Sequence, residues 1–338
     1  MTKLTYFTIC IASLLSIAPI NAKKKKQAAN STPVTIPTKP TEAPIQEKAI
    51  VSTPIYTQIN IPTKLNFCGT EVDLTRFDRR EGIDREILSM TFMHSTSMLM
   101  LKRANRYFPI VAPILKQQGI PEDFIYLMVI ESNLNPTARS SAGAAGLWQF
   151  MPGTAKDLGL EVSSEIDERM NIEKATFAAC TYLKQAYERF GNWKTVAASY
   201  NAGQGRISQF ISAQNQDNAL DLYLSEETMR YVYRIMAAKL LFENPQSFGF
   251  HLRKEDFYKP IATRPIAVSG GISNWAEFAE KYGMNYATLR RLNPWIIAPS
   301  LTNKRGNTYE VNIPVEDALH YGVEPMDIYN PAWISQGE

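Results

Sequence analysis

Residues 129–152 read VIESNLNPTARSSAGAAGLWQFMP and contain one acidic side chain, Glu131. It follows an apolar run, Ile125 to Ile130, that is typical of the buried flank of a helix. Burial among apolar neighbours raises the pKa of a carboxyl above its usual value of about 4.3. Such a group keeps its proton near neutral pH and can protonate the leaving oxygen of a glycosidic bond. Leu127 and Met128 lie four and three residues earlier, on the same helix face. We therefore expect Glu131 to emerge over an apolar floor as a general acid.

The residues after Glu131 suit a surface that faces a ligand. Ser132 can hydrogen-bond near a reacting centre, and the small residues that follow would let a ligand approach the backbone. Gln149 brings two donors and an acceptor. Trp148, Phe150 and Met151 of the same segment are expected to offer apolar surface to the ligand. A structural interpretation stays open, in which an acid simply ends a helix, but the helix dipole opposes a carboxylate at that end, so stability alone gives little reason for it.

Helical patterns position these residues. One runs from about Thr75 to Tyr107, and a second begins at Pro121 and leads into Glu131, before Asn135-Pro136 breaks it. Three further helical segments follow, IEKATFAACTYLKQAYERFGNW, KTVAASYNAGQGRI and EETMRYVYRIMAAKLLFE. The second of these repeats the arrangement around Glu131, since an alanine-rich helix ends at Tyr200-Asn201 and a glycine loop. Residues 65–250 are therefore predicted to be almost entirely α.

Four ordered segments resemble the signature segments of the family 23 lytic transglycosylases (SLT domain), and above all the membrane-bound lytic murein transglycosylase D group. They are ESNLNPTARSSAGAAGLWQFMPGTA, IDERMNIEKATFAACTYL, VAASYNAGQGRI and EETMRYVYRIMAA, and the resemblance extends from about residue 66 to 250. It implies a lysozyme-like α fold and cleavage of the β-1,4 bond between N-acetylmuramic acid and N-acetylglucosamine in peptidoglycan. The residues at the family's site positions are Glu131 as the single catalytic acid, and Ser132, Gln149, Met151, Tyr200, Asn201 and Tyr231 as substrate-binding residues.

The resemblance implies that one carboxyl serves twice. Glu131 would first donate a proton to the leaving oxygen. As a carboxylate it would then accept a proton from the muramic acid 6-hydroxyl, and the product would have a 1,6-anhydro end. Ordinary glycosidases use two carboxylates, and Asp157, Glu161 and Asp167 lie in the same body as candidates for a second. The alternatives are therefore a lysozyme-type muramidase and a non-catalytic peptidoglycan-binding protein. Without the family, Tyr200 and Tyr231 would be read as core tyrosines with satisfied hydroxyls.

Residues 262–316 predict a small α+β (βααβ) module. Ile266–Val268 and Thr308–Ile313 are its expected strands, with NWAEFAEKYG and YATLRRLN as short helices between them. The module resembles a degenerate LysM domain, a unit that binds N-acetylglucosamine polymers. It departs from that family at the turn Gly270-Gly271-Ile272-Ser273, so a purely structural role stays open. Residues 317–338 are expected to form a C-terminal tail.

The N-terminal region predicts export. Residues 1–22 have an early lysine, an apolar stretch and Ala22 at a cleavage position, which is typical of a signal peptide. Residues 23–64 contain six prolines, seven lysines and two glutamates and are expected to be a disordered linker. We expect the mature chain in the periplasm or cell envelope. Its basic arm leaves peripheral association with a membrane open.

The bulk composition excludes several other classes. The formal charge is +3, and because the linker carries the excess lysines, the body is net acidic and not expected to bind nucleic acid. The three histidines are scattered and no Cys/His cluster has metal-ligand spacing, so neither a metal nor another cofactor is expected. Cys68 and Cys180 either form a disulfide or, for Cys180, fill a core position. The expected partner is the peptidoglycan glycan strand, bound by a monomer.

Overall fold

The computed structural model describes residues 58–322 and 326–335. The helices of the main body are α1 (Phe77–Phe92), α2 (His94–Gln117), α3 (Phe124–Ser132), α4 (Pro152–Asp157), α5 (Ile172–Phe190), α6 (Trp193–Ala202), α7 (Gln204–Gln214) and α8 (Glu226–Glu243). Short 3-10 turns are Glu168–Met170, Pro245–Phe248, Lys254–Asp256 and Pro331–Trp333. The predicted mainly α fold class is confirmed. The proposed signal peptide and all but the last residues of the linker lie outside the described residues.

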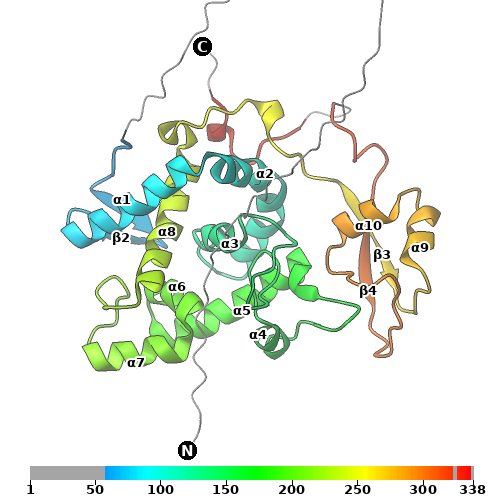
Figure 1. Ribbon diagram of the computed structural model, residues 1–338, viewed down its shortest axis with the longest axis horizontal. Helices are drawn as coiled ribbons and strands as arrows, with labels where there is room; N and C mark the ends of the chain where they lie inside the picture. Colours follow the sequence, from blue (N-terminus) through cyan, green and yellow to red (C-terminus); the bar gives the residue numbers. More distant parts are fainter. Residues whose placement is uncertain (1–57, 323–325, 336–338) are drawn as a thin grey trace, which may run out of the picture. The chain divides into compact units, whose positions relative to one another are not determined.

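Helix α3 lies in the middle of the body, with α2 and α8 against it (Figure 1). Nine residues long, it is mostly apolar, and Phe124, Leu127 and Met128 are fully inaccessible to solvent. Such a short helix is marginal on its own in water, so tertiary packing must hold it. It is therefore a fixed support for whatever its last turn presents.

The predicted helix from Thr75 to Tyr107 is divided in two. Helix α1 ends at Phe92, and Met93 adopts a non-helical conformation before α2 begins. The Ser97 hydroxyl donates to the carbonyl of Met90 across this break at 2.6 Å. It thereby satisfies one of the carbonyls that the last turn of α1 leaves without a partner inside the helix. The apolar periodicity continues across the break, so the pattern alone did not reveal it.

A β-hairpin precedes the helices and was not predicted. Strands β1 (Lys64–Phe67) and β2 (Thr70–Asp73) pair antiparallel. Their turn, Cys68-Gly69, has φ angles of 52° and 78°, the left-handed region that two-residue hairpin loops use. Ile61 is also buried in the core. The folded body thus begins before residue 65, and the predicted linker boundary at 64 is too late.

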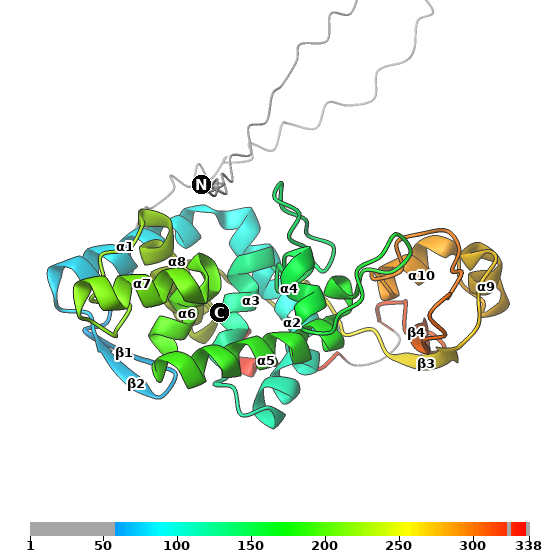
Figure 2. The same ribbon diagram turned by 90° about the horizontal axis from the view of Figure 1, so that it is seen from below.

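The C-terminal module has the predicted βααβ order. Strands β3 (Thr263–Val268) and β4 (Tyr309–Pro314) pair antiparallel. Helices α9 (Trp275–Lys281) and α10 (Tyr286–Leu292) cover one face of this pair (Figure 2). The module has its own apolar core, including Trp275 and Leu289. Asn293, which ends the LRRLN segment, is fully buried and bonds to both backbone groups of Asn312, at 2.7 Å each, so it fastens α10 to β4.

A loop of the main body joins the core of the module. Ile166 and Met170, between α4 and α5, belong to the module's apolar cluster. Ile166 also pairs with Ile296 as an isolated bridge, and the Asp167 N–H donates to the carbonyl of Trp295 at 2.8 Å. Because the two parts share apolar residues and backbone hydrogen bonds, the module is not a loosely attached appendage.

The predicted C-terminal tail is wrong for the described part of residues 317–338. Trp333 is 1% exposed in the core of the main body, and its indole N–H donates to the carbonyl of Phe242 at 2.7 Å. Leu252 pairs with Ile334 as a parallel bridge. A large aromatic side chain removes much apolar surface from water. This segment therefore completes the core of the body.

The two described cysteines do not form a disulfide. Cys180 is a buried residue of α5, as one of the two interpretations required, and Cys68 is free in the hairpin turn. Within residues 58–322 and 326–335, no group of His, Cys, Asp or Glu side chains could hold a metal ion. In the same residues we find no helix with the length and apolarity needed to span a membrane.

Candidate active site

Glu131 lies in the last turn of α3 and is half-buried. Its Oε1 accepts a hydrogen bond from the Tyr231 hydroxyl of α8 at 2.5 Å. Burial raises the pKa of Glu131 from 4.5 to about 7, against smaller lowering effects from the Tyr231 hydrogen bond and the charge of Arg234. A carboxyl with this pKa is populated in both protonation states near neutral pH, as a group that gives and takes a proton must be.

The end of α3 explains why the carboxyl faces outward from an apolar helix. The C-cap Asn133 and the next residue, Leu134, have φ angles of 49° and 57°. The N–H of Asn133 closes the last turn on the carbonyl of Val129 at 2.8 Å. Since the chain turns away here, the side chain one residue before the helix end is left uncovered, while Leu127 and Met128 beneath it stay buried. The predicted apolar floor is present.

Tyr231 and Tyr200 lie beside Glu131 but hold different partners. Tyr231 is buried, and burial together with the charge of Glu131 raises its pKa well above the usual range, so it remains a donor. The Tyr200 hydroxyl donates to the carbonyl of Trp148 at 2.7 Å, and its ring packs edge-on against Tyr182. Burial and the nearby charge of Glu131 also raise the pKa of Tyr200. Tyr231 thus contacts the acid, whereas Tyr200 ties α6 to the loop after α3.

The GLWQF loop is held by its own side chains. Gln149 has a φ of 50°, and its Nε2 donates to the carbonyls of Ala138 and Gly146, at 3.1 and 2.8 Å. Both of its donor hydrogens are therefore used inside the loop, and its Oε1 is the part open to a ligand. Trp148 is fully buried and its indole N–H donates to Thr176. Phe150 is buried too, so the expectation that Trp148 and Phe150 offer apolar surface to a ligand is wrong.

The remaining predicted residues have these positions. The Ser132 hydroxyl donates to the carbonyl of Met128 at 3.1 Å inside α3, so it is not free as predicted to bond near the reacting centre. The Oδ1 of Asn201 accepts from the Thr228 hydroxyl at 2.9 Å, which leaves its amide N–H₂ as the group for a ligand. Met151 is half-buried at the start of α4.

Two of the three candidates for a second acid are engaged elsewhere. Asp167 is buried and forms ion pairs with Arg139 and Arg169, which together hold its pKa below the usual range despite burial. Glu161 accepts from Tyr309 of the module at 2.8 Å. Asp157 is exposed at the end of α4.

Sequence reasoning missed Glu227, whose negative charge raises the pKa of Glu131. It is exposed in the first turn of α8, one turn before Tyr231. The EETMRY segment that pointed to Tyr231 contains it, so helical spacing from Tyr231 was the available signal.

Sequence reasoning also missed Arg169, which braces the GLWQF loop. Its Nη1 donates to the carbonyls of Gly143 and Phe150, at 2.7 and 3.0 Å, while Nε and Nη2 contact Asp167. Gly146 is needed here because a Cβ atom would lie 1.8 Å from the Arg169 carbonyl oxygen. Asp167 in turn bonds to the module through its backbone. One buried ion pair thus joins the loop beside the acid to the C-terminal module.

Two protein families match parts of the chain. Residues 109–222 match the transglycosylase SLT domain, and residues 264–317 match the soluble lytic transglycosylase C-terminal LysM-like domain. The chain is 26% identical over 227 residues to membrane-bound lytic murein transglycosylase D of Escherichia coli, covering 66% of this chain and 49% of that protein. The soluble lytic murein transglycosylase of E. coli is 33% identical over 124 residues, covering 33% of this chain and 19% of that one.

Among solved structures, the 70 kDa soluble lytic transglycosylase of E. coli is 25% identical with a TM-score of 0.35, over 40% of this chain and 24% of that one. The chain spans about half the length of the curated relative transglycosylase D. The two family matches show that the chain carries a transglycosylase SLT domain, in which Glu131 lies, followed by a soluble lytic transglycosylase C-terminal LysM-like domain.

Proposed function

We propose that this protein cleaves the β-1,4 bond between N-acetylmuramic acid and N-acetylglucosamine in peptidoglycan and forms a 1,6-anhydromuramic acid end. Glu131 is the single acid and base. The observation that carries the proposal is the hydrogen bond from the Tyr231 hydroxyl to the Glu131 carboxyl, which lies within the transglycosylase SLT match at residues 109–222. Burial raises the pKa of this carboxyl to about 7. The relatives named murein transglycosylases support the substrate class and an envelope location.

In the first step Glu131 acts as the acid. The raised pKa keeps a large fraction of the carboxyl protonated at neutral pH. Its proton passes to the glycosidic oxygen as the bond from that oxygen to the anomeric carbon breaks, which releases the N-acetylglucosamine 4-hydroxyl. The substrate's own acetamido oxygen bonds to the anomeric carbon in place of the leaving group. Asn201 is the better placed residue to orient that acetamido group, because its amide donors are open while the Tyr200 hydroxyl already donates to Trp148.

In the second step Glu131 acts as the base. The carboxylate takes the proton of the muramic acid 6-hydroxyl, whose oxygen bonds to the anomeric carbon and displaces the acetamido oxygen. Glu131 is then protonated again, so the cycle closes without water. The Tyr231 hydroxyl favours the carboxylate form by donating to it, since a hydrogen bond to the charged form lowers the pKa.

Mass spectrometry of the products of digested peptidoglycan tests this proposal. We expect muropeptides lighter by one water than those a hydrolase releases, and no release by Glu131→Gln. Fully hydrated ends from the wild type would refute the anhydro product. Digestion by Glu131→Gln at the wild-type rate would refute the assignment of the acid and base.

A muramidase is the second candidate, and Glu227 is the observation that favours it. It is the acidic side chain whose charge affects Glu131, and a water-activating base opposite the acid is what a hydrolase needs. If hydrolysis is the reaction, Glu227→Gln removes most of the rate and the products are hydrated. If Glu131 acts alone, Glu227→Gln leaves anhydro products and lowers the pKa of Glu131, which is measurable as a shift of the pH profile toward acid.

A further inference from the structure

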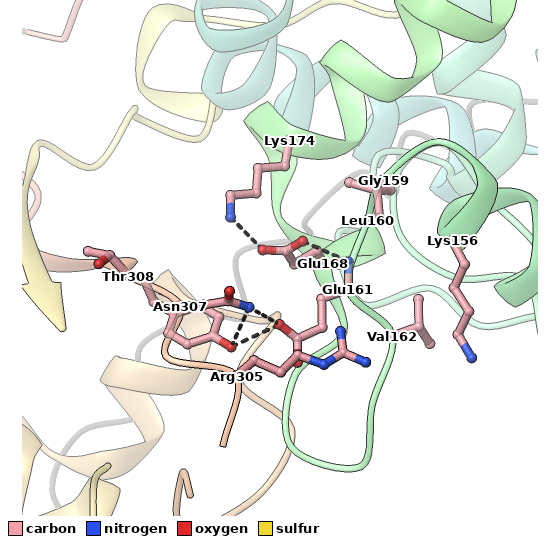
Figure 3. A pocket seen from close by; sticks show the side chains of 11 residues that line it. Lys156, Gly159, Leu160, Glu161, Val162, Glu168, Lys174, Arg305, Asn307 and Thr308 are labelled. Atoms are coloured by element: carbon pink, nitrogen blue, oxygen red, sulfur yellow. Dashed lines mark hydrogen bonds and ion pairs between the residues drawn. The ribbon is translucent and has the colours of Figure 1, made fainter. Parts of the chain in front are cut away.

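A cavity of about 570 Å³ lies where the main body meets the C-terminal module, apart from Glu131 (Figure 3). The end of α4 provides Lys156 to one side, and the start of α5 provides Lys174 to another. The turn before β4 provides Arg305. Its volume is within the range of ligand sites, which is about 300–1,000 Å³.

The acidic side chains of the cavity already have partners within the protein. Glu161 accepts from Tyr309 at 2.8 Å and from Asn307 at 3.1 Å. Glu168 accepts from the N–H of Glu161 at 2.8 Å and pairs with Lys174. Figure 3 shows these contacts along one wall. Since Glu168 and Tyr309 are buried, this wall is a fixed part of the fold.

Two cations of the cavity have no such partner. Within the described part of the chain, neither the Lys156 ammonium nor the Arg305 guanidinium makes a hydrogen bond or ion pair, and none is drawn to them in Figure 3. The Lys174 ammonium has three donors and contacts Glu168 alone. The cavity thus has three cationic and two acidic side chains, and most of its unused hydrogen-bonding capacity is cationic.

This arrangement selects the chemistry of a ligand. Guanidinium and ammonium groups bind carboxylates with charge-assisted hydrogen bonds. The two acidic side chains disfavour a dianionic phosphate. Both bonds that Glu161 accepts go to Oε2, so its Oε1 can accept from a peptide N–H group. A peptide with a free carboxylate can bind the cationic side chains through its C-terminus and Glu161 through an N–H group.

We propose that this cavity binds the carboxylate end of the peptide part of peptidoglycan, so that the module and the main body together recognise a peptide while the glycan lies at Glu131. This rests on the proposed function for the identity of the polymer. It gives the LysM-like module a role through its contact with the main body and not through a sugar-binding surface of its own.

Calorimetric titration of the full-length protein tests the site. The probe is a peptidoglycan peptide freed of its sugars, with a free C-terminal carboxylate, beside the same peptide with a C-terminal amide and beside inorganic phosphate. The variant is Lys156→Ala/Arg305→Ala, and the matched control is Lys116→Ala/Arg291→Ala, which removes one lysine of the body and one arginine of the module at exposed positions outside the cavity.

We expect the free peptide to bind about tenfold more weakly to Lys156→Ala/Arg305→Ala than to wild type, as the loss of two exposed charge pairs implies. The control variant should bind like wild type, and added salt should weaken the wild-type affinity. Equal binding by the double variant, equal binding of the amide, or no binding of the peptide by wild type would each overturn the proposal. Phosphate binding as tight as the peptide's would show a general anion site and overturn it too.

The same titration with Glu131→Gln separates this proposal from the proposed function. Glu131→Gln should bind the peptide like wild type, because Glu131 does not line the cavity. Peptide binding by a wild type that does not cleave peptidoglycan would sustain the cavity and refute the activity. Cleavage by wild type without peptide binding would sustain the activity and refute the cavity.

Discussion

The Tyr231 hydroxyl donates to Oε1 of Glu131 at 2.5 Å, from a residue one hundred positions later in the chain. Two helices that pack together in the core, α3 and α8, carry the pair. Burial favours the neutral carboxyl and the tyrosine favours the carboxylate. The balance of these two effects sets the pKa near neutrality, and the first four predictions concern this balance and the loop beside it.

Tyr231→Phe should raise the pKa of Glu131 above about 7 and lower kcat. The variant removes a hydrogen bond that favours the carboxylate, and a hydrogen bond to a charged group contributes about 1.5–3 kcal/mol, which corresponds to a rate loss of roughly ten- to hundredfold. The measurement is the pH profile of kcat/KM on soluble glycan chains. Tyr233→Phe, on the same helix and without a hydrogen bond to Glu131, is the control. An unchanged profile in Tyr231→Phe would contradict the role given to the hydroxyl.

The wild-type activity should fall as the pH rises through about 7. Glu131 must be protonated for the first step, and its pKa is about 7, so kcat/KM is expected to fall about tenfold per pH unit on the alkaline side. Initial rates between pH 5 and 9 measure this. A profile that stays flat to pH 9 would exclude Glu131 as the acid.

Glu131→Gln should be more stable than wild type at pH 8 and equally stable at pH 4. The folded protein binds the Glu131 proton more tightly than the unfolded chain, so the contribution of Glu131 to the free energy of unfolding is fully present below about pH 4.5 and is lost as the pH rises through about 7. Glutamine cannot ionise, and removing the buried charge should gain roughly 2 kcal/mol at pH 8. Urea unfolding at both pH values measures it, and a variant less stable than wild type at pH 8 would refute the raised pKa.

Arg169→Ala should destabilise the protein and slow the reaction. The guanidinium is buried, pairs with buried Asp167 and holds the carbonyls of Gly143 and Phe150. Breaking a buried pair by removing one partner costs about 3–5 kcal/mol. Arg139→Ala is the matched control, since its side chain is 48% exposed and contacts the same carboxylate, and it should cost under about 1 kcal/mol. Urea unfolding of both variants measures the loss of free energy of unfolding. Equal losses in Arg169→Ala and Arg139→Ala would show that the hydrogen bonds from Arg169 to the loop contribute nothing.

Trp333→Ala should destabilise the main body although it lies near the end of the chain. The indole is buried against Phe242 and Phe257 and donates to a core carbonyl, so truncation should cost about 3–5 kcal/mol. Leu319→Ala, at an exposed position of the same C-terminal region, should have little effect. Thermal unfolding compares the two. The same contact means that removing everything from residue 262 onward would damage the body as well as the module.

Local signals in the sequence were enough for much of the architecture. Periodic apolar positions predicted α5, α6 and α8, and the strand and helix patterns predicted the βααβ order of the module. The hairpin β1–β2 was missed because its strands are four residues each, too short for a clear alternation. The break at Met93 was missed because its neighbours keep the helical spacing.

The sequence by itself determined that Glu131 is the candidate acid, because an apolar helix ending in a lone carboxyl is a local pattern. It also pointed to Tyr231, through the resemblance of its segment to the family. Only the tertiary structure decided which partners these side chains have. In it Tyr231 donates to Glu131, whereas Tyr200 donates to Trp148. Gln149 and Ser132 donate to carbonyls of their own segments, and Trp333 packs in the core. The physical reason is that hydrogen bonds between residues far apart in the chain, and the burial of their side chains, depend on how the helices pack. Helical spacing indicates which face of a helix is buried but not which element packs against it.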